Sequence, residues 1–155
     1  MIYKEEMRNL LEVPAEYVVA HNIDSGEVAL GAGVALALCK KHSNLRNACK
    51  EYANANSHEV GRTFRFVDGE NIVYNMFTKP HVYFNAQNGM TMKEYLKNQE
   101  DCLNMLKRHM VFHKETKLAI PKIACGLDRC NWTDIKELLE KVFSDTDFEI
   151  LVCYI

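Results

Sequence analysis

Residues 118–155 read LAIPKIACGLDRCNWTDIKELLEKVFSDTDFEILVCYI, and this stretch predicts a strand, a helix and a second strand in order. Leu118 to Cys125 is an apolar run typical of a buried strand, and Gly126 to Asn131 is predicted to be a loop. Glu149 to Ile155 is the returning hydrophobic strand. The helix between them is predicted from one apolar stripe, formed by Ile135, Leu138, Leu139, Val142 and Phe143.

The amino-terminal part shows a similar order of elements. Tyr17 to His21 is a short, largely apolar run with β-forming residues, and Asn22 to Gly33 is a loop that contains three glycines. The apolar segment Val34 to Lys41 then predicts a helix.

The middle of the chain predicts a hairpin between two helices. Asn44 to Ala55 is a polar helix, and Thr63 to Val67 and Ile72 to Phe77 are strands on either side of the turn dipeptide Asp68-Gly69. Met92 to Met110 spaces its apolar residues at helical intervals. Strands that alternate with helices at both ends, with a hairpin in the centre, predict an α/β fold in which a mixed sheet has helices on both faces.

Composition favours one globular domain over residues 1–155, since 48% of the side chains are hydrophobic and no repeat or Pro/Gly-rich linker interrupts the chain. The 19 basic and 21 acidic residues give a net charge of -2, so any nucleic-acid contact would be local. The six cysteines form no CxxC pair, which favours a reducing compartment. We see no leader at Met1 and no apolar run of roughly 18 residues, so we expect a cytoplasmic protein without membrane contact.

Two glycine-containing loops, Asn22 to Gly33 and Cys125 to Asn131, each follow a predicted strand and precede a predicted helix. In open α/β sheets, ligands collect at the carboxyl ends of the strands, where helix amino termini favour anions such as a diphosphate. Gly31, Gly33 and Gly126 would let the main chain approach a ligand, although each glycine could equally serve only to make a turn. Neither loop has a Walker or dinucleotide-binding glycine pattern.

Asp128 and Lys79 are the candidate catalytic side chains. Asp128 lies at the tip of the second loop and could act as acid and base, or it could cap a helix or pair with Arg129. Lys79 follows the second hairpin strand and precedes Pro80, a position where most lysines are merely solvated. An amine that is kept deprotonated can attack an electrophilic sugar carbon, and a Lys–Asp pair then divides attack from proton transfer.

Other chemical groups give weaker signals. Cys125 lies beside the second loop without a pattern of His and Asn partners, so we expect it to pack there, with a thiol mechanism as the minor alternative. The six histidines and six cysteines lack the spacing of a zinc site, and we predict neither a metal nor a cofactor. Trp132 is expected to pack between helix and sheet.

Three segments are similar, in the same order, to motifs of one known family. Ile120 to Trp132 (IPKIACGLDRCNW) looks like a diphosphate loop with a distinctive Gly-Leu-Asp-Arg, and Ala20 to Leu36 (AHNIDSGEVALGAGVAL) looks like a first ligand loop. Phe77 to Pro80 (FTKP) looks like a strand end with a catalytic lysine. The chain thereby resembles, essentially end to end, macrodomains of the terminal ADP-ribose protein glycohydrolase type. The resemblance implies the macrodomain fold, a mixed central sheet between helices in three layers.

In this family a lysine attacks the anomeric carbon of the distal ribose, an acyl side chain departs, and an aspartate assists proton transfer and resolves the adduct. The resemblance places these roles on Lys79 and Asp128. It also implies contacts with ADP-ribose from the main chain of Lys122 to Leu127, from the Gly31 to Gly33 turn and, at the adenine end, from Leu10 and Ile155. The full implied ligand set is Asn9, Leu10, His21, Asn22, Gly31, Ala32, Gly33, Lys122, Ile123, Ala124, Cys125, Gly126, Leu127 and Ile155.

The adenine end departs from the family pattern. Macrodomains usually have a Gly-Asp pair that accepts a hydrogen bond from the adenine amine, and Arg8-Asn9 stands here instead. The Asn9 carbonyl can accept that bond but lacks the charge that strengthens it. The end of the chain, Cys153-Tyr154-Ile155, leaves open whether Tyr154 reaches the base or faces the core.

The resemblance favours a hydrolase that removes mono-ADP-ribose from acidic protein side chains. O-acyl-ADP-ribose and ADP-ribosylated nucleic acid are further substrates of the family, so the expected partners are ADP-ribose and modified protein, with modified nucleic acid as an alternative. Two other functions stay open: a non-catalytic ADP-ribose reader and a phosphatase of ADP-ribose 1''-phosphate. The phosphatase would need an in-line water and has no use for the lysine. We expect a monomer.

Overall fold

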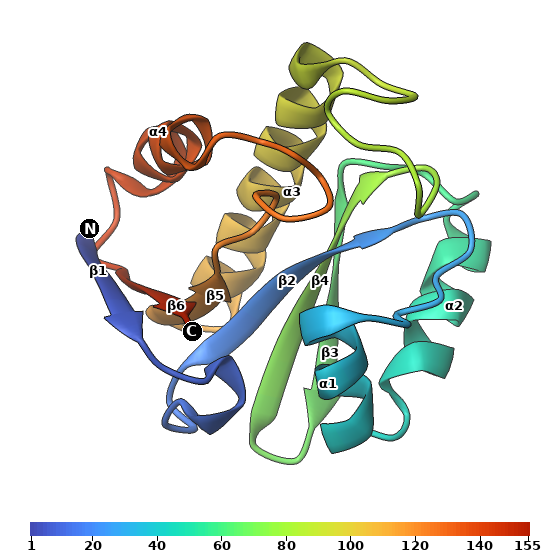
Figure 1. The fold of residues 1–155 in the computed structure, drawn as a ribbon. Coiled ribbons are helices and arrows are strands. Elements are labelled where there is room, and N and C mark those ends of the chain that lie inside the picture. Colours follow the sequence, from blue (N-terminus) through green and yellow to red (C-terminus); the bar gives the residue numbers. More distant parts are fainter.

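The computed structural model describes residues 1–155 and contains one six-stranded sheet in the order β1-β6-β5-β2-β4-β3 (Figure 1). Only β3 runs antiparallel to its neighbour, β4, and the other neighbouring strands are parallel. The mixed sheet predicted from the sequence is therefore confirmed. The strands are β1 (Ile2–Met7), β2 (Val18–Asp24), β3 (Arg62–Asp68), β4 (Asn71–Lys79), β5 (Lys117–Pro121) and β6 (Glu149–Tyr154).

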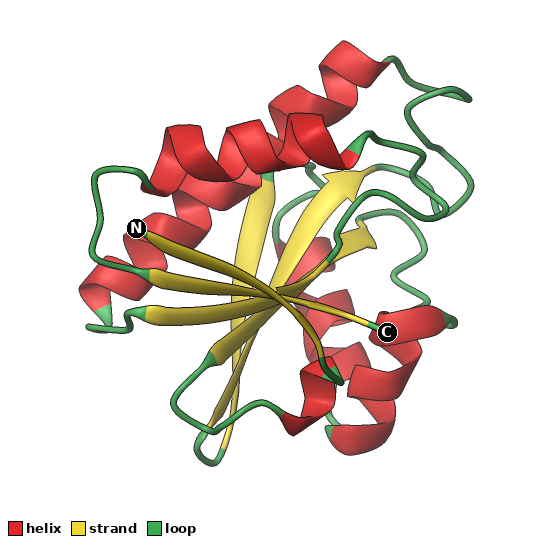
Figure 2. Cartoon of the chain, turned by 60° about the vertical axis from the view of Figure 1, so that its left-hand side comes forward, coloured by secondary structure: helices red, strands yellow, loops and turns green.

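Helices cover both faces of the sheet (Figures 1 and 2). The pair α3 (Met92–Phe112) and α4 (Trp132–Phe143) lies on one face, and α1 (Gly33–Lys41) and α2 (Leu45–Ala55) lie on the other. A short 3₁₀ helix, η1 (Leu10–Glu12), follows β1. The three-layer α/β/α architecture is thus confirmed. No helix of the chain combines the length and apolar character that a bilayer crossing requires.

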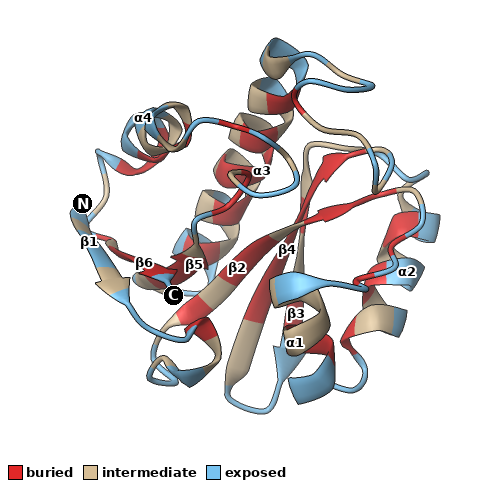
Figure 3. Ribbon diagram, in the orientation of Figure 1, coloured by how far each residue is buried: buried red, intermediate tan, exposed pale blue.

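Each helical layer buries its own apolar cluster against the sheet. The cluster under α3 and α4 has 22 buried residues, and the cluster under α1 and α2 has 11. Figure 3 shows that the central strands β2 and β4 are mostly buried, whereas the outer helix surfaces are exposed. Burial of these apolar side chains is the main term that stabilises the sheet between its helices.

The long helix α3 forms as its sequence predicts. Thr91 accepts a hydrogen bond from the Glu94 N–H while the Glu94 side chain bonds the Thr91 N–H, so a capping box fixes the first turn. Its buried face also carries two polar side chains, Tyr95 and Gln99, which are fully buried and one helical turn apart. The polar groups of both side chains form hydrogen bonds within the protein.

Three strands differ from the predictions. Strand β1 was not predicted, because IYKEEM has no apolar alternation; it pairs only with β6 at the sheet edge, where charged side chains are tolerated. Strand β2 continues through Asn22 to Asp24, so the first loop begins at Ser25. Strand β5 ends at Pro121, where its pairing with β6 ends, and Ile123 to Cys125 lie in the loop.

The parallel strands bring five chain positions to one edge of the sheet. These are the carboxyl ends of β1, β2, β4, β5 and β6, at Met7, Asp24, Lys79, Pro121 and Tyr154. In open α/β sheets this is the edge at which ligands bind.

Candidate active site

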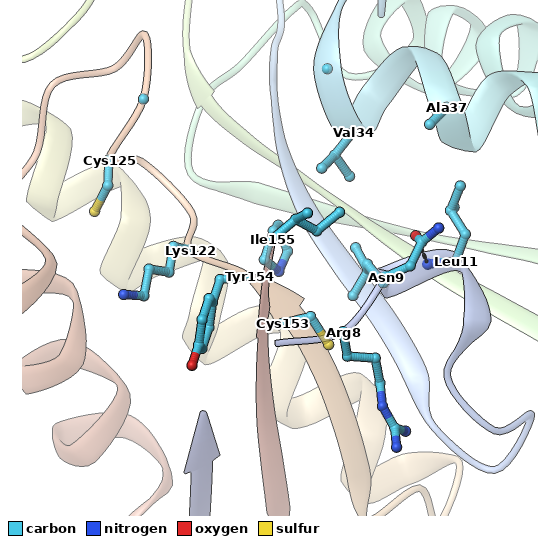
Figure 4. A pocket seen from close by; sticks show the side chains of 14 residues that line it. Arg8, Asn9, Leu11, Val34, Ala37, Lys122, Cys125, Cys153, Tyr154 and Ile155 are labelled. Atoms are coloured by element: carbon cyan, nitrogen blue, oxygen red, sulfur yellow. Dashed lines mark hydrogen bonds between the residues drawn. The ribbon is translucent and has the colours of Figure 1, made fainter. Parts of the chain in front are cut away.

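Two adjoining cavities open at this edge. The larger, of about 650 Å³, is bordered by the β1–η1 turn, the start of α1, the loop after β5 and the end of β6 (Figure 4). The smaller, of about 230 Å³, is bordered by β2, α1 and the tip of the same loop. Both are lined by Val34, Pro121 and Gly126, so the two cavities adjoin at these residues.

Most residues of the implied ligand set line these cavities. The larger cavity is lined by Asn9, Leu10, Gly33, Lys122, Cys125, Gly126 and Ile155. The smaller is lined by His21, Asn22, Ala32, Ile123, Ala124, Gly126, Leu127 and Asp128. Gly31 lines neither cavity, although it directly precedes the turn at the start of α1.

Asp128 lines the smaller cavity and contacts Lys79, which lies behind it and lines neither cavity. The Lys79 Nζ lies 2.6 Å from the Asp128 Oδ1, and it also donates to the Val82 carbonyl at 2.9 Å. Their side chains are only 9% and 13% exposed, so this ion pair is largely shielded from water. The main chain of Asp128 is held separately, because its carbonyl accepts a hydrogen bond from the Ala86 N–H at 3.0 Å. The contact excludes the reading of Lys79 as a solvated lysine.

Asp128 neither caps a helix nor pairs with Arg129, so both of these alternative roles are wrong. Asn131, not Asp128, occupies the N-cap position of α4. No ion pair joins Asp128 to Arg129, and the Arg129 main chain has a left-handed φ of 62°, which turns the loop at this point. The carboxylate therefore faces the cavity and Lys79.

Tyr95 also belongs to this site, although its spacing in the sequence predicted only an apolar position of a helix. Its hydroxyl donates to the Asp128 Oδ2, and it also lies 3.2 Å from the Thr78 Oγ1 and 3.2 Å from the Asn22 Nδ2. Burial, together with the charge of Asp128, raises the pKa of Tyr95 well above its usual value, so the phenol keeps its proton. The Asn22 Nδ2 also donates to Gln99 at 2.6 Å, so the protein already uses both of its amide protons.

His21 presents an unpartnered acceptor beside the smaller cavity. Its Nε2 lies 2.6 Å from the Asn75 Oδ1, and the Asn75 amide donates to two backbone carbonyls, so Nε2 must carry the proton. The buried Nδ1 is left without a partner. Burial lowers the pKa of His21 to about 4, which keeps the ring neutral at pH 7.

The loop between β2 and α1 is held in shape by two charged side chains. The Asp24 Oδ2 accepts from the Glu27 and Val28 N–H groups at 2.8 and 3.1 Å. Arg46 donates to the Ala29 and Leu30 carbonyls at 2.9 and 3.1 Å. These contacts order the segment that leads into the turn before α1.

Comparison with known proteins shows the family of the chain. No protein-family model matches the chain. The fold superposes with the macrodomain of Mycobacterium tuberculosis DarG at a TM-score of 0.82 and 17% identity, covering 98% of this chain and 97% of that one. The chain is 31% identical to the human ADP-ribose glycohydrolase OARD1 over 144 residues, which cover 93% of this chain and 86% of that protein. The chain belongs to the macrodomains of the ADP-ribose glycohydrolase type.

This macrodomain also superposes on Thermosipho africanus DarTG, which was solved in complex with ADP-ribose. The TM-score is 0.71 at 14% identity, and the match covers 90% of this chain and 38% of that one. The two proteins therefore share a fold.

The Arg8-Asn9 departure has a structural role in this macrodomain. The Asn9 Oδ1 accepts a hydrogen bond from the Leu11 N–H at 3.0 Å and so caps η1 (dashed in Figure 4). At the opposite side of the larger cavity, Tyr154 is 37% exposed and the Lys122 Nζ lies 5.1 Å from the centre of its ring. Tyr154 therefore lies at the cavity and outside the core.

Proposed function

We propose that this macrodomain binds ADP-ribose and hydrolyses the bond between mono-ADP-ribose and acidic side chains of proteins. The observation that carries the proposal is the contact of a shielded amine, Lys79, with a carboxylate, Asp128, at the edge of a cavity in a macrodomain of the glycohydrolase type. An amine nucleophile with an adjacent acid and base can break and remake a bond at a sugar carbon.

The cavities match the parts of ADP-ribose in order. At about 650 Å³ the larger cavity falls in the range that holds small-molecule ligands, and its apolar lining suits adenine. The turn Ala32-Gly33 and the loop Lys122 to Leu127 flank the middle of the surface. The amino terminus of α1, at Gly33, points its free N–H groups there, and these favour the diphosphate. The distal ribose then lies in the smaller cavity, beside Asp128.

In the first step the Asp128 carboxylate takes a proton from the Lys79 Nζ. The neutral amine forms a bond to the anomeric carbon of the distal ribose, and the bond from that carbon to the acyl oxygen breaks. The departing side chain keeps the electron pair as a carboxylate and receives the proton that Asp128 holds. Lys79 is then joined to the sugar as a secondary ammonium.

In the second step Asp128, again ionised, takes a proton from water as the water oxygen bonds to the anomeric carbon. The bond from that carbon to the Lys79 Nζ breaks, and the amine leaves neutral. Transfer of the proton from Asp128 back to Lys79 restores the ion pair. The net change is the addition of one water molecule across the ester.

The two other functions fit the site less well. A reader module needs no amine against a carboxylate, and a shielded ion pair of this kind is weak support for stability. A phosphatase would need an in-line water at phosphorus and has no use for the Lys79 amine. O-acyl-ADP-ribose and ADP-ribosylated nucleic acid carry the same type of bond at the same carbon and remain alternative substrates.

One experiment separates the three functions. The protein is incubated with Glu-linked mono-ADP-ribosylated protein and, separately, with ADP-ribose 1''-phosphate, and free ADP-ribose and phosphate are measured. The proposal predicts release of ADP-ribose from the modified protein and no phosphate release. ADP-ribose binding without turnover would favour a reader, and phosphate release a phosphatase.

A further inference from the structure

We propose that Tyr95 is a positioning residue that holds the Asp128 carboxylate in place while Lys79 is bonded to the sugar, and so sets the rate at which the adduct is hydrolysed. This inference rests on the proposed function. It assigns Tyr95 to the second step of the reaction, in which Lys79 is bonded to the sugar and Tyr95 is the other side-chain donor to Asp128.

The hydrogen bonds of Asp128 carry the argument. Its two carboxylate oxygens are bonded by two different donors, Oδ1 by the Lys79 Nζ and Oδ2 by the Tyr95 hydroxyl. When Nζ bonds to the sugar carbon, it becomes a secondary ammonium with one N–H fewer and is drawn toward that carbon, so its hold on Oδ1 weakens. The Tyr95 hydroxyl is then the side-chain donor whose position the adduct leaves unchanged, and it orients the carboxylate toward the incoming water.

Tyr95 is built to hold this orientation. A phenol has one proton and two acceptor positions, and here the proton goes to Asp128 while Thr78 and Asn22 fill the acceptor positions at 3.2 Å each. The ring is fully buried in the first turn of α3, and the capping box at Thr91 fixes that turn. The Tyr95 hydroxyl thus has one acceptor for its proton, the Asp128 carboxylate.

The loop that carries Asp128 makes such an anchor necessary. It has left-handed main-chain angles at Ala124 and Arg129, with φ of 67° and 62°, and the side chain of Asp128 is hydrogen-bonded only to Lys79 and Tyr95. A displacement of about 1 Å at a catalytic group can lower a rate by about a hundredfold.

The test is Tyr95→Phe, which removes the hydroxyl and keeps the ring. The expected result is a kcat on Glu-linked mono-ADP-ribosylated protein that is about 10-fold to 100-fold lower, with kcat/KM within about threefold of the wild-type value. The split is expected because kcat/KM reports the attack by Lys79, and before that attack the Lys79 Nζ still holds the Asp128 Oδ1 in the variant. Intact-mass measurement during turnover should show the ADP-ribosylated enzyme accumulating, and the adduct should be absent from Lys79→Ala/Tyr95→Phe.

Tyr74→Phe is the matched control. Tyr74 is equally buried in the same cluster, and its hydroxyl also donates to a carboxylate, that of Glu115. Glu115 lies just beyond the far end of α3, a helix of 21 residues that spans about 30 Å. Tyr74→Phe should lower the melting temperature about as much as Tyr95→Phe and leave kcat unchanged. Should Tyr95→Phe fail to fold, Thr78→Val removes a contact of the same hydroxyl and should lower kcat in the same way, by several-fold.

Two results would overturn the inference. One is a kcat of Tyr95→Phe equal to that of the wild type. The other is a parallel fall of kcat and kcat/KM without an adduct, which is what a purely structural role produces. Failure of the proposed function looks different, since the wild-type protein would then release no ADP-ribose at all, and both proposals would fall together.

Discussion

The Lys79–Asp128 ion pair makes a prediction about stability that can be tested without a substrate. Lys79→Met and Asp128→Asn each remove one partner of the pair and leave the other charge shielded from water. We therefore expect each single variant to be less stable than the wild type, and the double variant Lys79→Met/Asp128→Asn to be no less stable than either single variant.

The size of the effect follows from the contacts. Breaking a fully buried pair costs about 3–5 kcal/mol, and losing one charge-assisted hydrogen bond costs about 1.5–3 kcal/mol. The Asp128 side chain is 13% exposed and keeps its bond from Tyr95, so the lower range applies. We expect about 2 kcal/mol for each single variant. In a chain of 155 residues that corresponds to a fall in Tm of about 4–8 °C.

The assay is urea unfolding of the four proteins at pH 7, treated as a double-mutant cycle. Independent sites would give a loss of about 4 kcal/mol for the double variant, whereas a direct pair predicts about 2 kcal/mol or less. Additivity within about 0.5 kcal/mol would refute the pair and, with it, the transfer of a proton from Lys79 to Asp128.

Three further predictions concern other parts of the site. The pKa of His21 is about 4 in the folded protein against 6.5 in the unfolded chain, so its contribution to stability is present above pH 6.5 and is lost as the pH falls. Between pH 7 and pH 5, the free energy of unfolding in urea should fall by about 2 kcal/mol more for the wild type than for His21→Gln. Equal losses for the two proteins would disprove a neutral buried ring. Asn9→Asp keeps the cap of η1 and adds a negative charge, so its Tm should stay within about 2 °C of the wild-type value. Calorimetry should show that the variant binds ADP-ribose several-fold more tightly. Weaker binding would contradict the role of residue 9 as a hydrogen-bond acceptor for adenine. A Cβ on Gly26 would lie 2.2 Å from the Pro80 carbonyl oxygen, whereas a Cβ on Gly31 would meet nothing within 4 Å. Gly26→Ala should therefore lower Tm, and Gly31→Ala should leave it unchanged. Weaker ADP-ribose binding by Gly31→Ala would then indicate that the main chain of Gly31 approaches the ligand.

The sequence predicted the layers of the fold because its periodicity is strong where elements are buried. The apolar runs that became β5 and β6 and the stripe that became α4 each bury one continuous face. Strand β1 was not predicted, because it lacks such a buried apolar face. Its side chains are largely exposed and charged, and it is a strand only because the edge of β6 is available for pairing.

The sequence was less informative about the site, since chain distance hides contacts between loops. Lys79 and Asp128 could be singled out from motifs, but their contact depends on the parallel order of β2, β4 and β5. Tyr95 read as one more apolar position of an amphipathic helix. A signal was present, because Tyr95 and Gln99 lie one turn apart on a face that is otherwise apolar, and buried polar groups require partners.

The most direct measurement of the catalytic role is the release of ADP-ribose from Glu-linked mono-ADP-ribosylated protein by the wild type and by Lys79→Ala, together with the affinity of both for ADP-ribose. An amine nucleophile predicts that Lys79→Ala loses turnover by at least about a thousandfold, while its Kd stays within about tenfold of the wild-type value, or about 1.4 kcal/mol. Undiminished release by Lys79→Ala would contradict the mechanism.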